Sequence, residues 1–104
     1  MLRVYSDYLG VLRDMRSVLH ALETRDIDLA RQLRRAAASV ALNMAEGSGN
    51  AGGTRRQRYL SALGSAREVV AGLQVAEALG YVTVEAALMA RLDRVVGVLV
   101  RLVR

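Results

Sequence analysis

The sequence contains no cysteine, proline, phenylalanine, tryptophan or lysine, and it has one histidine, His20. Without cysteine there is neither a disulfide nor a thiolate metal site, and a single histidine cannot build a histidine metal centre within one chain. Without proline no helical segment is interrupted, and the hydrophobic fraction of 53% consists mainly of alanine, leucine and valine. These absences favour an all-α chain with no metal and no cofactor.

A chain of 104 residues is long enough for one domain with its own core, so residues 1–104 are predicted to form a single domain. Charged residues interrupt the apolar positions near the N-terminus, so we expect no signal peptide there. No apolar run approaches the roughly 20 residues of a membrane span. We therefore expect a soluble, cytoplasmic protein that does not contact a membrane.

Apolar residues recur every three or four positions in four segments, a spacing that predicts amphipathic helices. The first helix is predicted over residues 3–23, the second over 27–46, the third over 55–79, and the last as far as Leu102. We expect Asp26, Thr54 and Thr83 to cap the second, third and fourth helices. Gly47 and Gly80 are expected to end the second and third. Short connections then imply an antiparallel up-down-up-down four-helix bundle.

Glycine is concentrated in residues 47–53, GSGNAGG, which we interpret as a flexible connection between two helices. The segment fits the dinucleotide pattern G-x-G-x-x-G, but a helix is predicted before it where that motif needs a strand. A phosphate-binding P-loop would need lysine in place of Gly53. Gly64 and Gly72 lie on a face of small residues in the third helix, where we expect a neighbouring backbone to approach closely.

Three segments resemble a known family: QLRRAAASV at 32–40, NMAEGSG at 43–49 and ALGSARE at 62–68. They are similar to bacterial four-helix-bundle proteins encoded within intervening sequences of large-subunit ribosomal RNA genes. The resemblance implies a bundle that assembles into a ring, commonly a homopentamer. A structurally similar group, the accessory variability proteins of diversity-generating retroelements, is pentameric and basic and works with a reverse transcriptase and nucleic acid. The intervening-sequence family itself has no settled activity.

The net charge is +5, and all 15 basic residues are arginine. Two arginine sets are predicted to bind nucleic acid: Arg55, Arg56 and Arg58 with Tyr59, and Arg91, Arg94 and Arg101. Positive charge at the start of a helix opposes the helix dipole, so the first set is expected to pair with acidic groups of a neighbouring chain or with phosphate. An unpaired, solvated cluster is the alternative.

A polar row, Arg35, Ser39, Asn43 and Glu46, follows one side of the second helix. These residues lie within the segments that carry the family resemblance. We predict that the row forms a buried polar network or an interface, with Glu68 as a partner for Arg35 and a compensating group for Glu46. The alternative is an ordinary solvated face.

Two functions follow from these observations. The first is a ring-forming accessory factor for RNA, DNA or a ribonucleoprotein. The second is a structural oligomer or protein-binding adaptor in which arginines pair with carboxylates between subunits. An enzyme is disfavoured, because no pair of carboxylates lies near His20 in sequence and no metal-ligand spacing is present.

Overall fold

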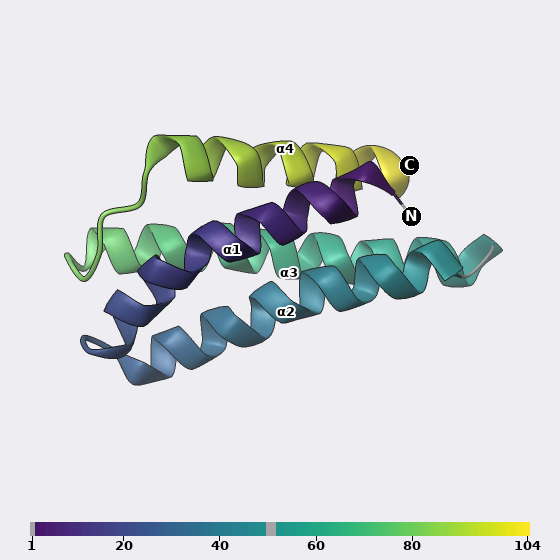
Figure 1. Ribbon diagram of the computed structural model, residues 1–104. Coiled ribbons are helices and arrows are strands. Elements are labelled where there is room, and N and C mark those ends of the chain that lie inside the picture. Colours follow the sequence, from purple (N-terminus) through teal and green to yellow (C-terminus); the bar gives the residue numbers. More distant parts are fainter. Residues whose placement is uncertain (1, 50–51) are drawn as a thin grey trace.

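A computed structural model describes residues 2–49 and 52–104, and within these residues the chain forms a bundle of α-helices (Figure 1). The helices are α1 (Arg3–Glu23), α2 (Ile27–Gly49), α3 (Gly52–Ala78) and α4 (Ala86–Leu102). Each helix packs against the ones next to it in sequence, and α1 also packs against α4. The chain runs up and down, so both termini lie at the same end of the bundle. The predicted all-α up-down bundle is confirmed.

The first half of the chain follows the sequence prediction closely. Helix α1 spans the predicted residues. Asp26 caps α2 as expected, because its Oδ1 accepts a hydrogen bond from the backbone N–H of Leu29 at 3.0 Å. The carboxylate therefore satisfies one of the amide groups that the first turn of α2 leaves without an intrahelical partner.

The glycine-rich segment was predicted incorrectly. Gly47 does not end α2, which continues to Gly49, and α3 begins at Gly52 before the expected Thr54 cap. A Cβ atom on Gly47 would lie 2.5 Å from Cε1 of Tyr59, so this glycine is needed for packing against the ring. Gly52 has a φ of +63°, which suits glycine at the start of α3. The expected loop residues Asn50 and Ala51 lie outside the described residues.

The end of α3 has the predicted glycine but not the predicted next cap. Gly80 has a φ of +76°, and the backbone N–H groups of Gly80 and Tyr81 donate to the carbonyls of Glu77 and Ala76, both at 3.0 Å. This is a Schellman motif. Thr83 is not the cap of α4, because α4 begins only at Ala86. Residues 81–85 form an extended connection, tied back where the N–H of Val84 donates to the Glu77 carboxylate at 3.0 Å.

The core is apolar throughout the described residues, with no buried charged side chain among them. Its largest members include Tyr8, Met15 and Leu73, and the whole surface of each is buried. Tyr8 keeps its hydroxyl satisfied by donating to the carbonyl of Ala37 on α2 at 2.8 Å. Burial also raises the pKa of Tyr8 well above its ordinary value near 10. A buried phenol with one good acceptor thus fixes α1 against α2.

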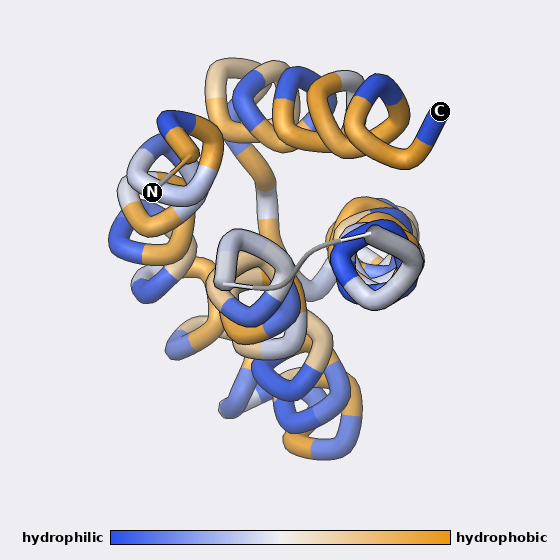
Figure 2. Tube along the Cα trace, turned by 90° about the vertical axis from the view of Figure 1, so that its right-hand side faces the viewer, coloured by the Kyte–Doolittle hydropathy of each residue, from blue (hydrophilic) through white to orange (hydrophobic). Residues whose placement is uncertain are grey.

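The helices are not packed equally closely. At Gly72 a Cβ atom would lie 2.4 Å from Cδ2 of Leu33, so α3 approaches α2 closely there, as predicted. Gly64 does not share this role, since a Cβ atom there would meet no described atom within 4 Å. Figure 2, viewed nearly along α3, shows α4 running across the bundle rather than end-on. Of the helices that the structure describes, none is long and apolar enough to cross a membrane.

Candidate nucleic-acid interface

One end of the bundle brings together three segments that are far apart in the sequence: the start of α1, the start of α3 and the end of α4 (Figure 1). A hydrogen bond joins two of them, because Nε of Arg56 donates to the backbone carbonyl of Val103 at 2.8 Å. Arg101 and Arg104, which flank this carbonyl in sequence, therefore lie beside the arginines of α3. We call this end, residues 3–12, 39–49, 52–65 and 95–104, the basic end.

The basic end holds most of the net charge of the protein. Its side chains comprise six arginines and two carboxylates, whereas the rest of the chain carries nine arginines and eight carboxylates. The six arginines are Arg3, Arg55, Arg56, Arg58, Arg101 and Arg104, and the carboxylates are Asp7 and Glu46. Four of the five net positive charges consequently lie at one end of a bundle whose long dimension is 42 Å.

The predicted cluster at the start of α3 has partners within its own chain. Arg56 caps the end of α4, where the exposed carbonyls favour a cation. Nη1 of Arg58 forms an ion pair with Oε2 of Glu46 at 3.0 Å, and both side chains are partly exposed. Glu46 therefore has the compensating arginine that its position near the end of α2 requires. Each of these arginines neutralises a helix end or a carboxylate that the neighbouring helix supplies.

Tyr59 does not extend this cluster into a surface for stacking bases. Only 4% of the residue is exposed, and its ring lies against Gly47. The sequence prediction that Tyr59 contacts nucleic acid therefore needs correction, because a base cannot reach a ring that the α2–α3 pair encloses. Tyr59 instead holds the end of α2 to the start of α3.

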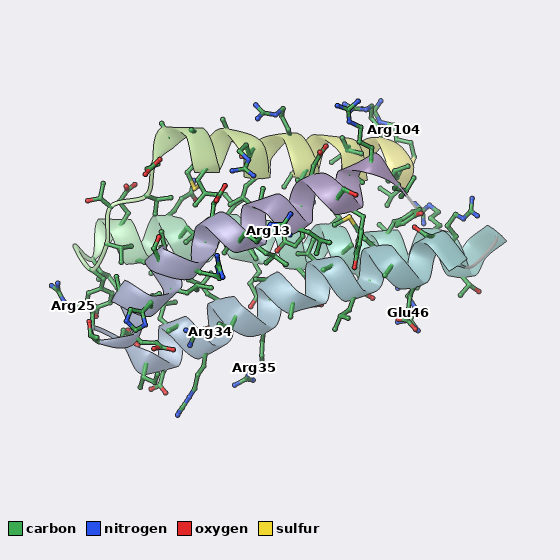
Figure 3. All side chains as sticks on the ribbon, in the orientation of Figure 1. Arg13, Arg25, Arg34, Arg35, Glu46 and Arg104 are labelled. Atoms are coloured by element: carbon green, nitrogen blue, oxygen red, sulfur yellow. The ribbon has the colours of Figure 1, made fainter. Side chains whose placement is uncertain are left out.

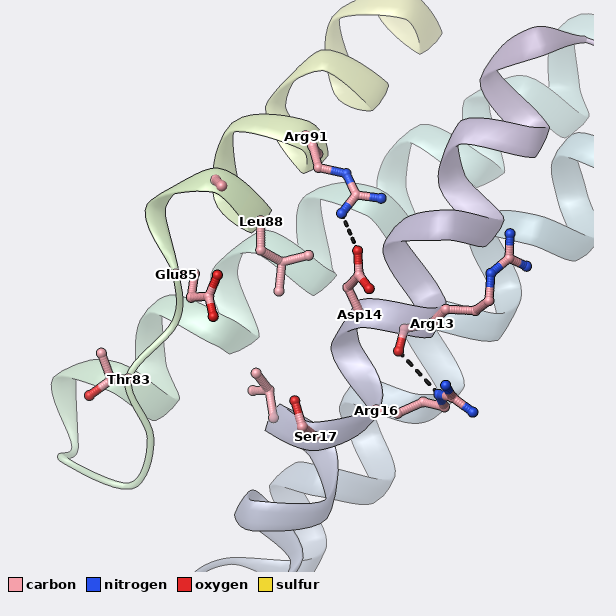
Figure 4. Close-up of a pocket in the computed structure, with 10 residues that line it drawn as sticks. Arg13, Asp14, Arg16, Ser17, Thr83, Glu85, Leu88 and Arg91 are labelled. Carbon is pink, nitrogen blue, oxygen red and sulfur yellow. Dashed lines mark hydrogen bonds and ion pairs between the residues drawn. The ribbon is translucent and has the colours of Figure 1, made fainter.

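The second predicted arginine set is divided by the structure. Arg101 belongs to the basic end. Arg91 lies nearer the start of α4, away from the basic end, and pairs with Asp14 of α1 across the space between the two helices (Figure 4). Arg94 lies between Arg91 and Arg101 in the sequence of α4, and it is exposed. The set is thus spread along α4 rather than gathered at one site.

The polar row of α2 lies along its contact with α3. The Oγ atoms of Ser39 and Ser65 are 2.8 Å apart, a hydrogen bond that joins the two helices. Nδ2 of Asn43 donates to Oγ of Ser39 at 3.1 Å and to its carbonyl at 2.9 Å. These three side chains are half-buried. They form a small network in which both hydroxyls and the side-chain N–H group of Asn43 have partners.

The two ends of the row differ from this centre. Arg35 and Glu46 are exposed in the single chain, and Figure 3 shows both pointing away from the bundle. Arg35 and Glu68 line the same shallow groove, but among the described residues no ion pair joins them. Within one chain the row is therefore a half-buried centre with exposed ends.

The model of the 23S rRNA-intervening sequence protein family matches residues 2–101, nearly the whole length of the bundle. The chain belongs to this family. No curated protein and no solved structure is significantly similar to it. The three segments that carry the family resemblance all lie on α2 and α3, the closely packed pair.

In this family member, sequence reasoning missed Arg3 and Arg104 as parts of the basic end. A signal for them was present, because an up-down bundle places the start of α1, the start of α3 and the end of α4 at one end. Counting charges by bundle end rather than by sequence cluster would have found the whole set. No group of three His, Cys, Asp or Glu residues suited to a metal occurs in the described parts of the chain.

Proposed function

We propose that this protein is a non-enzymatic, ring-forming accessory factor, a homopentamer, that binds RNA or DNA through its basic end. The observation that carries this proposal is the segregation of charge, with six arginines and two carboxylates at one end of the bundle. Guanidinium groups bind phosphate through two parallel hydrogen bonds, which suits them to a nucleic-acid backbone. A charge distribution concentrated on one face is the usual electrostatic mark of such binding.

Assembly would multiply the effect of the basic end. In a ring whose axis is parallel to the bundles, every copy presents its basic end on the same side. A polyanion that contacts several copies at once then binds more tightly than one that contacts a single copy, because the later contacts are intramolecular. A chain of this size gains in this way a binding surface that one bundle end is too small to provide.

The test removes charge from the basic end without touching the arginines that have structural partners. The variant carries Arg3→Gln, Arg101→Gln and Arg104→Gln, and its matched control carries Arg13→Gln, Arg31→Gln and Arg67→Gln in the other half. Binding to RNA and DNA is measured as a function of salt. Each lost phosphate contact lowers the slope of log K against log salt by about 0.7–0.9.

We expect the slope to fall by roughly two units in the first variant and to change little in the control. Equal changes in both would show that binding follows net charge and not the basic end. An assembled protein that binds neither RNA nor DNA at low salt would contradict the proposed nucleic-acid function.

The second candidate is a structural oligomer or protein-binding adaptor. The engagement of Arg56 and Arg58 within the chain favours it, because part of the cluster is already used to hold helix ends together. Under this alternative, assembly would persist with no affinity for nucleic acid at any salt concentration. The salt titration above therefore separates the two candidates.

A further inference from the structure

The contact between α1 and α4 is open along much of its length. Two cavities lie on it, of about 830 Å³ and about 310 Å³, and Arg91 lines both. Figure 4 shows the larger cavity, with Leu88 and Glu85 on one side and Ser17 on the other. The Arg91–Asp14 ion pair joins the two helices at the larger cavity (Figure 4). A charged bridge thus joins α1 to α4 across this open space.

The smaller cavity has an apolar floor and a charged rim. Valines line its floor, from α1 and from α4: Val4, Val11, Val95 and Val98. Its rim carries Asp7 on the α1 side and Arg94 on the α4 side, and both are exposed. Within the described part of the chain neither of these two charges has an ion-pair partner. An acid and a base therefore stand unpaired on opposite sides of one cavity.

Two small residues of α1, Gly10 and Ser17, lie beside this space. Gly10 and Ser17 are seven residues apart, so they lie on one side of α1. The side chain of Arg91 passes over Gly10, where a Cβ atom would lie 3.0 Å from its Nη2. Small side chains on a helix edge permit another helix to approach closely.

We propose that this α1–α4 face binds a second copy of the same chain, with α1 of one copy against α4 of the next. The proposal rests on the oligomer proposed above and deepens it by naming the interface. Asp7 and Arg94 line the same cavity, so they lie at the same height along the bundle. Rotation about an axis parallel to the bundle preserves that height, so an α1–α4 contact made in this way sets Asp7 of one copy level with Arg94 of its neighbour.

The same rotation places the Asp14–Arg91 pairs of two neighbouring copies at one common height. Acidic and basic side chains then alternate around the ring at two levels, that of Asp7 and Arg94 and that of Asp14 and Arg91. The acidic residue on α1 and the basic residue that complements it on α4 both belong to this chain. A second copy of the chain therefore fits this face better than an unrelated helix. Copies related in this way present their basic ends on the same side. The interface and the proposed nucleic-acid surface are therefore compatible.

The test exchanges the two charges. Asp7→Arg and Arg94→Asp are each expected to weaken self-association by roughly a hundredfold, because like charges then meet across each contact. The double variant Asp7→Arg/Arg94→Asp restores opposite charges and is expected to return association to within roughly threefold of the parent. Asp93→Arg, on α4 but outside both cavities, and Arg67→Asp on α3 are the matched controls.

Mass photometry or sedimentation across a dilution series gives the readout, and circular dichroism confirms that each variant is folded. Mixing the two single variants adds a second readout, because every unlike contact then joins arginine to aspartate. A ring with an even number of copies can alternate the variants and recover fully. A pentamer must keep one like-charged contact, so it recovers only in part.

The outcomes separate this inference from the wider proposal. An assembled parent whose association is unaffected by either single variant, or not restored by the double variant, overturns this interface and leaves the oligomer intact. A parent that remains monomeric at high micromolar concentration overturns both. If the single variants weaken self-association and the double variant restores it, but the assembled parent binds neither RNA nor DNA, only the proposed nucleic-acid function is contradicted.

Discussion

The α2–α3 pair and the α1–α4 pair show two ways of joining antiparallel helices in one chain. Between α2 and α3, glycines bring the helices together at Gly47 and Gly72, and serines join them through a hydrogen bond. Between α1 and α4, an arginine and an aspartate cross an open space lined with valine. The first pair is closed by small residues, and the second is held apart by long ones.

The difference follows from side-chain size. Glycine, alanine and serine allow two helix axes to approach, so dispersion contacts and a direct hydroxyl–hydroxyl bond become available. Arginine needs room for its guanidinium and keeps it solvated, so a pair bridged by arginine retains grooves. The closed pair is therefore suited to hold the fold, while the open pair retains surface for another molecule.

The largest expected effect comes from adding carbon atoms to the closed pair. Gly72→Val should lower the free energy of unfolding by about 2–3 kcal/mol, because the new side chain overlaps the buried Leu33. In the open pair, Gly10→Ala meets only the mobile end of Arg91, and alanine favours the helix. It should leave stability unchanged or raise it by up to about 1 kcal/mol. Urea unfolding at a fixed protein concentration compares them, and equal losses would remove the distinction between the pairs.

A smaller effect is expected from Tyr8, which fixes α1 to the closed pair. Burial raises its pKa in the folded state, so its stabilising contribution is complete below pH 10 and is lost as the pH rises further. The chain has no lysine or cysteine whose titration would overlap with this loss. Tyr8→Phe should cost about 0.5–1.5 kcal/mol at pH 7, from the lost bond to Ala37.

The same variant should show a shallower loss of stability above pH 10 than the parent. Thermal unfolding measured from pH 7 to pH 11 tests this, with Tyr5→Phe as the control at a half-buried tyrosine. Identical alkaline profiles for Tyr8→Phe and the parent would show that another group controls the alkaline loss.

The serine bond of the closed pair should be measurable as a coupling. Ser39→Ala and Ser65→Ala should each cost about 1 kcal/mol, because each removes the half-buried hydroxyl–hydroxyl bond between α2 and α3. The double variant should cost less than the sum by about 0.5–1 kcal/mol. Strict additivity in chemical unfolding would mean that the two hydroxyls bond to water as readily as to each other.

The smallest effect is expected at the exposed end of the polar row. Glu46→Ala breaks the ion pair with Arg58, in which the two side chains are 57% and 42% exposed, so the cost should stay below about 0.5 kcal/mol. A markedly larger loss, appearing only at concentrations where the protein is assembled, would show that a neighbouring copy buries this end. Asn43→Ala, nearer the centre of the row, provides the comparison and should cost about 1 kcal/mol.

Much of the fold could be predicted because helix periodicity and topology are local properties. The bounds of α1, the Asp26 cap and the Gly80 turn follow from residue types a few positions apart. The glycine-rich segment could not be predicted in this way. Gly47 is needed because Tyr59 occupies the space beside it, a contact between residues that only the folded hairpin brings together. The tendency of glycine to end helices, which depends only on local sequence, predicts instead that Gly47 ends α2.

The candidate site shows the same limit. The arginines near Arg55 were found as a run in the sequence, but their partners were not, because the Val103 carbonyl comes from another helix. Tyr59 is predicted to bind nucleic acid together with the neighbouring arginines, although it lies on the apolar face of α3 and is buried. Gly64 and Gly72 are equivalent in sequence, and only the position of Leu33 distinguishes them.

The unequal charge of the two bundle ends also makes the molecule an electric dipole. Because the excess of arginine lies at one end of a 42 Å body, a nearby polyanion exerts a torque as well as an attraction. The protein should therefore rotate during its approach and meet the polyanion with the basic end first. Salt shortens the range of this orienting field to about 10 Å at 0.1 M, so the association rate constant should fall more steeply with salt than a randomly oriented encounter would predict.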